Sequence, residues 1–344
     1  MRTDPALHYL DNAATTLVDP AVADAIHKAL LTQWANPSSL YDPAVLAERS
    51  LNAARARVAR TLNAGVKEIY FTGCGSEGNN LAILGAALPR RAWGSKVVTT
   101  GFEHPSVQRP IRALRDRGFT VVEVAPGADG RLNVDDLLDQ VDRNTVLVAC
   151  MAVNNETGAV QDIARLAREV KAKNSRTAVH IDAVQAWLRL PLDMKKLPGV
   201  DTLTVSGHKV HAPKGIGALY LCENQRQHLQ PPYLGGHQER GIRPGTENVP
   251  YAVGLGLAAE QGARRMRSAA GRAAALNARL RAGLAALPGI TVHSPADAVA
   301  EVLNFSTNCV NSQTMISYLN DRQIYVSGGS ACDKGEPSHT LQAM

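Results

Sequence analysis

Between residues 69 and 221 the chain alternates short β-branched runs with stretches of helical pattern. The apolar runs, which have the length of buried strands, are 69–72, 97–100, 121–124, 145–150, 178–181, 202–205 and 217–221. Helical patterns separate several of them, at 80–88, 112–117 and 161–173. This alternation is typical of βαβ units, which build a mainly parallel sheet with helices on both faces. The sequence therefore predicts an α/β fold with one large central sheet.

The pattern changes after Pro250. A long helical stretch rich in Ala, Leu and Arg ends near 287–289, and a strand-like run at 302–306 and a helix around 315–319 follow. With 344 residues, the chain is longer than a single domain of typical size. We expect a large α/β domain over 17–254 and a smaller α+β domain that includes 255–344.

Composition and charge exclude several classes of protein. The net charge is +6, but the Arg-rich stretch 264–281 carries no interleaved aromatic residues, so we expect a solvated helix face and no nucleic-acid partner. No apolar run approaches about 18 residues, so we expect no membrane partner and a cytoplasmic location. Five scattered cysteines without a C-x-x-C pair argue against a disulfide framework or a zinc site, and we expect no metal.

Several chemically active side chains follow predicted strands. They are Ser76, His104, Asp182 and the run Ser206–Lys209. In such sheets ligands bind at the carboxyl ends of the strands, so we expect these groups to converge at one edge. A lysine there can form an imine with an aldehyde cofactor, and an aspartate can hold a pyridinium nitrogen protonated. Pyridoxal phosphate needs both groups.

The order of the motifs extends this prediction to the whole chain. They are 9–16 (Tyr-Leu-Asp-Asn-Ala-Ala-Thr-Thr), 36–39, 103–105, 154–158, 206–209, 243–248 and 329–332 (Gly-Ser-Ala-Cys). In this order they resemble the cysteine desulfurases of the nitrogen-fixation and iron–sulfur-assembly type, within the class V aminotransferase group of fold-type I pyridoxal-phosphate enzymes. The resemblance implies that residues 1–16 join the smaller domain. It also implies conversion of L-cysteine to L-alanine, with the sulfur carried as a persulfide on Cys332.

The resemblance also implies a role for each site residue. Lys209 would carry the cofactor and remove the substrate Cα proton, and His104 would stack on the ring and transfer protons. The phosphate would be bound by Gly75, Ser76, Ser206 and His208, the ring nitrogen by Asp182, and the ring hydroxyl region by Gln185 and Asn155. Thr246 would reach the phosphate of the neighbouring subunit, which implies a homodimer. Cys332 would pass sulfur to an acceptor protein, either an iron–sulfur scaffold or a tRNA-thiolation enzyme.

The residues alone leave alternatives open. The run 73–78 satisfies the G-x-G-x-x-G dinucleotide pattern, which would suit a nicotinamide oxidoreductase. Asp182 could cap a helix beginning near Val184, His104 could be a turn residue, and Thr246 could lie in a turn before a helix. Another pyridoxal-phosphate lyase, such as a selenocysteine lyase, would share Lys209 without using Cys332 in the same way.

Two expectations concern the carboxy-terminal part. Cys332 follows the Gly/Ser-rich run 327–331, which suits a thiolate that reaches the cofactor and then delivers sulfur. The stretch from Cys332 to Pro337 is shorter than in bacterial housekeeping members of the family. Family members continue beyond the position of Met344 with a strand that carries the arginine for the substrate carboxylate. We therefore expect a truncated smaller domain and a weakened affinity for cysteine.

Overall fold

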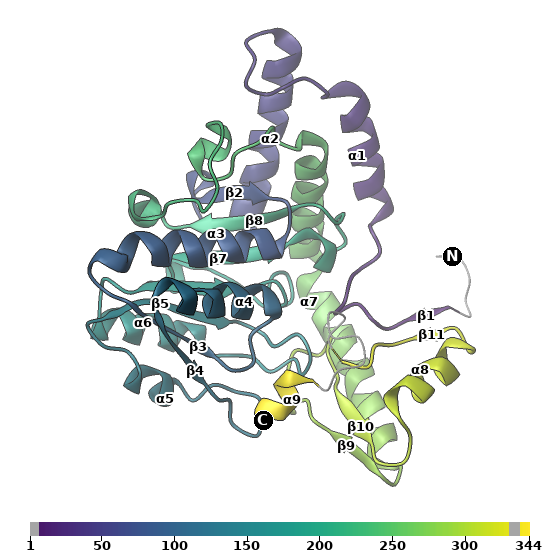
Figure 1. The fold of residues 1–344 in the computed structure, drawn as a ribbon. Helices are drawn as coiled ribbons and strands as arrows, with labels where there is room; N and C mark the ends of the chain where they lie inside the picture. Colours follow the sequence, from purple (N-terminus) through teal and green to yellow (C-terminus); the bar gives the residue numbers. More distant parts are fainter. Residues whose placement is uncertain (1–6, 330–337) are drawn as a thin grey trace.

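The computed structural model describes residues 7–329 and 338–344, and its centre is a seven-stranded sheet (Figure 1). The strands run in the order β2-β8-β7-β6-β5-β3-β4. Their bounds are β2 Ile69–Thr72, β3 Lys96–Thr100, β4 Thr120–Val124, β5 Thr145–Met151, β6 Ala178–Asp182, β7 Thr202–Ser206 and β8 Gly217–Leu221. Within this seven-stranded sheet, the two pairs that include β8 are antiparallel and the others are parallel. The predicted mainly parallel α/β sheet is confirmed.

Helices cover both faces of this sheet. Their bounds are α1 Pro20–Thr32, α2 Asp42–Thr61, α3 Gly75–Ala87, α4 Pro105–Ala113, α5 Val134–Asp139, α6 Ile163–Lys173 and α7 Val249–Ala285. Alternate residues of β5 point to opposite faces, because side chains alternate along a strand. Leu147 and Ala149 pack with α3 and α4, whereas Val148 and Cys150 belong to the core beneath α2, α6 and α7.

Helix α6 illustrates why these segments are helical. Its apolar residues Ile163, Leu166, Ala167 and Val170 are spaced by three or four, so they form one buried stripe. The Asp162 side chain accepts a 3.0 Å hydrogen bond from Arg165 N and thereby caps the first turn.

The helix expected over 112–117 is wrong in its bounds, because α4 ends at Ala113 and a 3-10 turn occupies Arg115–Arg117.

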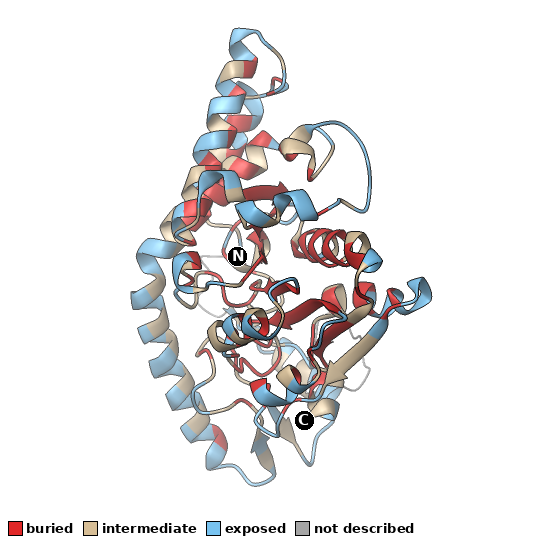
Figure 2. Ribbon diagram, turned by 90° about the vertical axis from the view of Figure 1, so that its left-hand side faces the viewer, coloured by how far each residue is buried: buried red, intermediate tan, exposed pale blue. Residues whose placement is uncertain are grey.

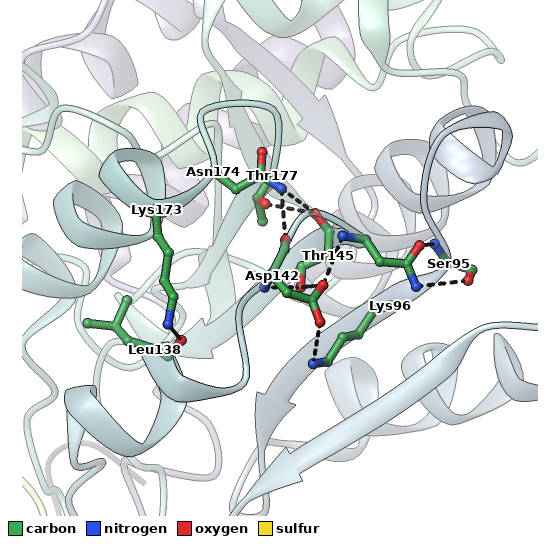
Figure 3. Close-up of polar contacts among 9 residues, drawn as sticks. Ser95, Lys96, Leu138, Asp142, Thr145, Lys173, Asn174 and Thr177 are labelled. Carbon is green, nitrogen blue, oxygen red and sulfur yellow. Dashed lines mark hydrogen bonds and ion pairs between the residues drawn. The ribbon is translucent and has the colours of Figure 1, made fainter.

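Polar contacts hold the strands at their amino ends (Figure 3). Lys96 Nζ lies 3.0 Å from Asp142 Oδ2, and Asn174 Nδ2 donates to the backbone oxygen of Asp142 at 3.0 Å. Thr177 Oγ1 donates to Thr145 O at 2.7 Å. These contacts tie the starts of β3, β5 and β6 together, away from the edge where the predicted site residues lie.

The remaining elements join the two ends of the chain. Strand β1 (His8–Tyr9) pairs in parallel with β11 (Ile324–Tyr325), and β9 (Ile290–Val292) pairs antiparallel with β10 (Phe305–Thr307). Helices α8 (Ser312–Asn320) and α9 (His339–Ala343) complete this part. The strand expected over 302–306 occupies 305–307 instead.

The division into domains at 254/255 stays a prediction, because α7 runs through that point without a break. Along most of its exposed second half, α7 lies apart from the central sheet (Figure 2).

Within the described ranges, none of the helices has both the length and the apolar character needed to cross a membrane.

Candidate active site

A cavity of about 250 Å³ opens at the carboxyl ends of the central strands, and we call it the strand-end cavity. Its lining includes nine of the predicted site residues: Gly75, Ser76, His104, Asn155, Asp182, Gln185, Ser206, His208 and Lys209. Thr246 is not among the lining residues, and Cys332 lies outside the described residues. The predicted convergence of motifs from separate strands is therefore present, while the role of each residue stays a prediction.

Lys209 reaches the cavity from the end of β7. That strand ends at Ser206 and passes into a 3-10 turn over Gly207–Lys209. The turn is tight, because a Cβ on Gly207 would lie 3.0 Å from Ile216 O. Lys209 Nζ donates to the carbonyl oxygens of Ala13 at 2.5 Å and Ala14 at 2.7 Å. The amino-terminal motif therefore forms one wall of the cavity and holds the amine there.

The turn over 73–78 connects β2 to α3. Gly75 is the first residue of α3, and a Cβ at this position would lie 2.9 Å from Val184 Cγ2. Backbone N–H groups at the start of a helix bind phosphate, so this turn could hold a phosphate group. The dinucleotide alternative fits poorly. Strand β2 lies at the edge of the sheet and pairs only with the antiparallel β8, whereas that fingerprint belongs to a parallel βαβ unit.

His208 adds a polar ring to the same side of the cavity. Burial, together with the charges of Lys209, Lys214 and His104, lowers the pKa of His208 to about 4. Its Nδ1 lies 3.2 Å from Thr15 Oγ1. The imidazole is thus neutral at pH 7 in a basic neighbourhood, and that neighbourhood would favour an anionic ligand.

Asp182 ends β6 and is only 6% exposed. Its Oδ1 accepts from Val184 N at 2.9 Å, and its Oδ2 accepts from Asn79 Nδ2 at 2.8 Å. Asp182 therefore caps a turn, although no helix begins at Val184. Both of these donors are neutral amides, and a buried carboxylate is most stable beside a cation. A protonated ring nitrogen in the cavity would supply that cation.

Two amide side chains have defined orientations. Gln185 Nε2 donates to Ala13 O at 2.9 Å, and its Oε1 accepts from the guanidinium of Arg189. Asn155 lines the cavity, whereas Oδ1 of the preceding Asn154 accepts from the backbone N of Glu156 and Thr157, each at 2.9 Å. Asn154 thus fixes the turn, and the adjacent Asn155 lines the cavity.

His104 is both a helix cap and a lining residue. Its Nδ1 accepts from Ser106 N at 3.1 Å at the start of α4 and lies 2.8 Å from Ser106 Oγ. The turn alternative from the sequence is therefore present together with the position in the cavity.

Thr246 is exposed, in the loop before α7. Near it, Arg243 Nε donates to Glu77 Oε1 at 2.7 Å, and Glu77 Oε2 accepts from Gly73 N at 2.5 Å. The carboxylate of Glu77 thus connects this loop to the turn that begins α3.

Sequence reasoning missed Asn79, Ser106 and Cys74, as well as the carbonyls of Ala13 and Ala14. Asn79 could have been found, because it lies four residues after Gly75 and so shares its face of α3.

Among residues 7–329 and 338–344 there is no group of three or more His, Cys, Asp or Glu side chains that could hold a metal ion.

Comparisons with known proteins give matches over nearly the whole chain. The Aminotransferase class-V family pattern matches residues 8–344. A "Cysteine desulfurase" of Nostoc sp. is 42% identical over 340 residues, which cover 98% of this chain and 84% of the relative. "Cysteine desulfurase NifS" of Azotobacter vinelandii is 38% identical over 343 residues, which cover 98% of this chain and 83% of the relative.

Solved structures give the same result. A "NIFS-LIKE PROTEIN" superposes with a TM-score of 0.92 at 33% identity, and the match covers 98% of this chain and 89% of that chain. A structure described as "SspA in complex with cysteine" superposes with a TM-score of 0.85 at 32% identity, covering 98% and 94%.

Proposed function

Because the chain belongs to the class-V aminotransferase family, we propose that it is a pyridoxal-phosphate-dependent cysteine desulfurase. It converts L-cysteine to L-alanine and retains the sulfur as a persulfide on Cys332. The observation that carries this proposal is the strand-end cavity, in which Lys209, Asp182 and His104 meet. Relatives named as cysteine desulfurases, and a neighbour solved with cysteine, support the choice of substrate.

The cavity suits the cofactor in three respects. It has a buried carboxylate for the ring nitrogen, an amine for the aldehyde, and a helix start with Ser206 and His208 for the phosphate. The close approach of Gly75 to Val184 leaves no room for a larger side chain in the turn that would hold the phosphate. When bound, pyridoxal phosphate supplies an electron sink that stabilises negative charge at the substrate Cα.

The side chains divide the remaining work. Asp182 would hold the ring nitrogen, and Gln185 and Asn155 would donate toward the ring hydroxyl. The Lys209 amine removes the Cα proton, and His104 transfers protons as an additional acid or base. The Cys332 thiolate forms a bond to the substrate sulfur. The substrate C–S bond then breaks, and its electron pair stays with the carbon that becomes the methyl group of alanine.

We also propose a homodimer in which Thr246 reaches the cofactor phosphate of the partner. Its exposure and its absence from the cavity lining of its own chain support this arrangement. Apolar side chains are also exposed on α1 and the connection to α2, which extend beyond the sheet in Figure 1: Leu30, Leu31, Trp34, Leu40 and Tyr41. An exposed apolar cluster of this kind is typical of a protein–protein contact.

The persulfide would pass to an acceptor protein, either an iron–sulfur scaffold or a tRNA-thiolation enzyme, in the cytoplasm. A selenocysteine lyase activity is the second candidate, because it uses the same amine. The test is to purify the chain with pyridoxal phosphate, record the visible absorbance, and measure alanine from L-cysteine and from L-selenocysteine. A visible band and alanine from cysteine are expected. Turnover of selenocysteine alone would favour the second candidate, and a protein without a visible band would contradict both.

A further inference from the structure

A buried hydrogen-bond network connects Asp182 to His104 through a residue that neither lines the strand-end cavity nor reaches solvent. Its centre is Asn79 on α3, which is 0% exposed. Asn79 Nδ2 donates to Asp182 Oδ2 at 2.8 Å and to Ser106 Oγ at 2.9 Å. Asn79 Oδ1 lies 3.0 Å from His180 Nε2. One amide therefore contacts three side chains from two other elements.

The chemistry of the partners fixes the direction of each bond. A carboxylate only accepts, so the NH₂ side of Asn79 has to face Asp182. The amide oxygen then faces His180, so His180 Nε2 has to carry a proton and donate it. Burial lowers the pKa of His180 to about 3, so the ring is neutral and its Nδ1 has no proton. That nitrogen accepts from Thr202 Oγ1, 2.9 Å away.

The second branch leads to His104. Because Asn79 Nδ2 donates to Ser106 Oγ and cannot accept, the Ser106 hydroxyl proton has to point elsewhere. His104 Nδ1 lies 2.8 Å from that oxygen and already accepts from Ser106 N. His104 Nδ1 is therefore an acceptor, so the neutral ring carries its proton on Nε2.

We infer that Asn79 is a positioning residue, which orients the Asp182 side chain by donating to its Oδ2 and, through Ser106, holds His104 in the tautomer whose Nδ1 accepts. A donated N–H bond fixes the rotamer of the carboxylate that accepts it. Asn79 has this role toward the cofactor only if Asp182 meets the ring nitrogen, as proposed above. The directions of the bonds do not depend on the cofactor.

The first test needs no variant. The full chain labelled with ¹⁵N-histidine is examined by two-bond ¹H–¹⁵N correlation at pH 7, without and with pyridoxal phosphate. His180 is expected to show a protonated Nε2 and a bare Nδ1, and His104 a bare Nδ1. A proton on His180 Nδ1 with a bare Nε2 would overturn the inference, because Asn79 would then have to turn its oxygen toward the Asp182 carboxylate.

The second test compares Asn79→Leu, which keeps the approximate shape, with Asn80→Leu as the matched control. Asn80 is the next residue of α3, and its Nδ2 donates to Ser76 O at 2.9 Å. Loss of a hydrogen bond to a charged group is expected to weaken pyridoxal phosphate binding roughly ten- to hundredfold in Asn79→Leu. The control is expected to bind as wild type does. Equal affinities of both variants would contradict the role of Asn79.

The two tests separate the possible failures. If Asn79→Leu does not fold, the histidine spectra of the wild-type chain still decide the direction of the bonds. If the wild-type chain binds no pyridoxal phosphate, the proposed function fails, whereas the histidine spectra of the cofactor-free chain still report on the network.

Discussion

The amine of Lys209 donates a 2.5 Å hydrogen bond to the carbonyl oxygen of Ala13, although the two residues are 196 positions apart. Gln185 Nε2 donates to the same oxygen at 2.9 Å. The amino-terminal motif is thus part of the strand-end cavity and orients two groups that face the predicted cofactor. When the amine reacts with an aldehyde, these carbonyl contacts have to be replaced, so the position of the amino-terminal segment and occupancy of the site are linked.

Lys209→Ala is expected to abolish the visible absorbance of bound cofactor, because it removes the amine at the end of β7. Lys214→Ala is the matched control: this lysine is exposed, lies five residues away and does not line the cavity. The measurement is borohydride reduction followed by peptide mapping. A reduced adduct on a different lysine in the Lys209→Ala protein would show that the assignment is wrong.

Cys332→Ser is expected to keep the cofactor absorbance but to form no persulfide, since the hydroxyl is a far weaker nucleophile toward sulfur than a thiolate. Cys309→Ser serves as the control, because Cys309 is an exposed free thiol outside the cavity. Sulfide release from cysteine with dithiothreitol present is measured for both. Undiminished release from Cys332→Ser would mean that another group receives the sulfur.

Glu103 provides a test through the pH dependence of stability. It is fully buried, Oε1 accepts from Thr100 Oγ1 at 2.7 Å and Met151 N at 2.9 Å, and burial raises its pKa to about 8 from 4.5. The folded state therefore binds this proton more tightly than the unfolded state. The linked stability is fully present below about pH 4.5 and is lost as the pH rises toward 8.

Glu103→Gln mimics the protonated acid and does not titrate. Its free energy of unfolding should therefore increase relative to that of wild type as the pH rises. The expected gain is on the order of 2 kcal/mol between pH 5 and pH 7, from urea unfolding at each pH. Glu48→Gln, at an exposed position, should show no such trend. Parallel curves for Glu103→Gln and wild type would contradict a buried neutral carboxyl.

Two glycines on α7 separate packing from helix propensity. A Cβ on Gly256 would lie 2.8 Å from Ala54 Cα of α2, whereas a Cβ on Gly271 would meet nothing within 4 Å. Gly256→Ala is expected to destabilise by about 1–3 kcal/mol through overpacking. Gly271→Ala is expected to stabilise by up to about 1 kcal/mol, because alanine favours the helix. Thermal unfolding of both variants checks the opposite signs, and a stable Gly256→Ala protein would mean that α2 and α7 are less closely packed.

Features of the fold that depend on the local sequence pattern could be predicted from the sequence. The strands of the central sheet follow from runs of apolar residues, and the positions of Asp182 and Lys209 follow from their place at the end of β6 and in the turn after β7. Strand β1 could not be predicted in this way, because it has two residues and forms only through pairing with β11, more than 300 positions away. Asn79 was missed for a similar reason. Its place on the same face of α3 as Gly75 is visible in the sequence, but its partner Asp182 is 103 positions away, and no local pattern indicates that contact.

The measurement that tests cysteine desulfurase activity most directly is a single turnover with sulfur mapping. The cofactor-loaded chain is mixed with one equivalent of L-cysteine, quenched, and divided for alanine analysis and for mass spectrometry of the peptide that contains Cys332. We expect about one alanine for each added sulfur atom on Cys332, and no added sulfur on Cys74, the thiol that lines the cavity. Alanine without sulfur on Cys332, or no alanine from a chain that holds the cofactor, would contradict it.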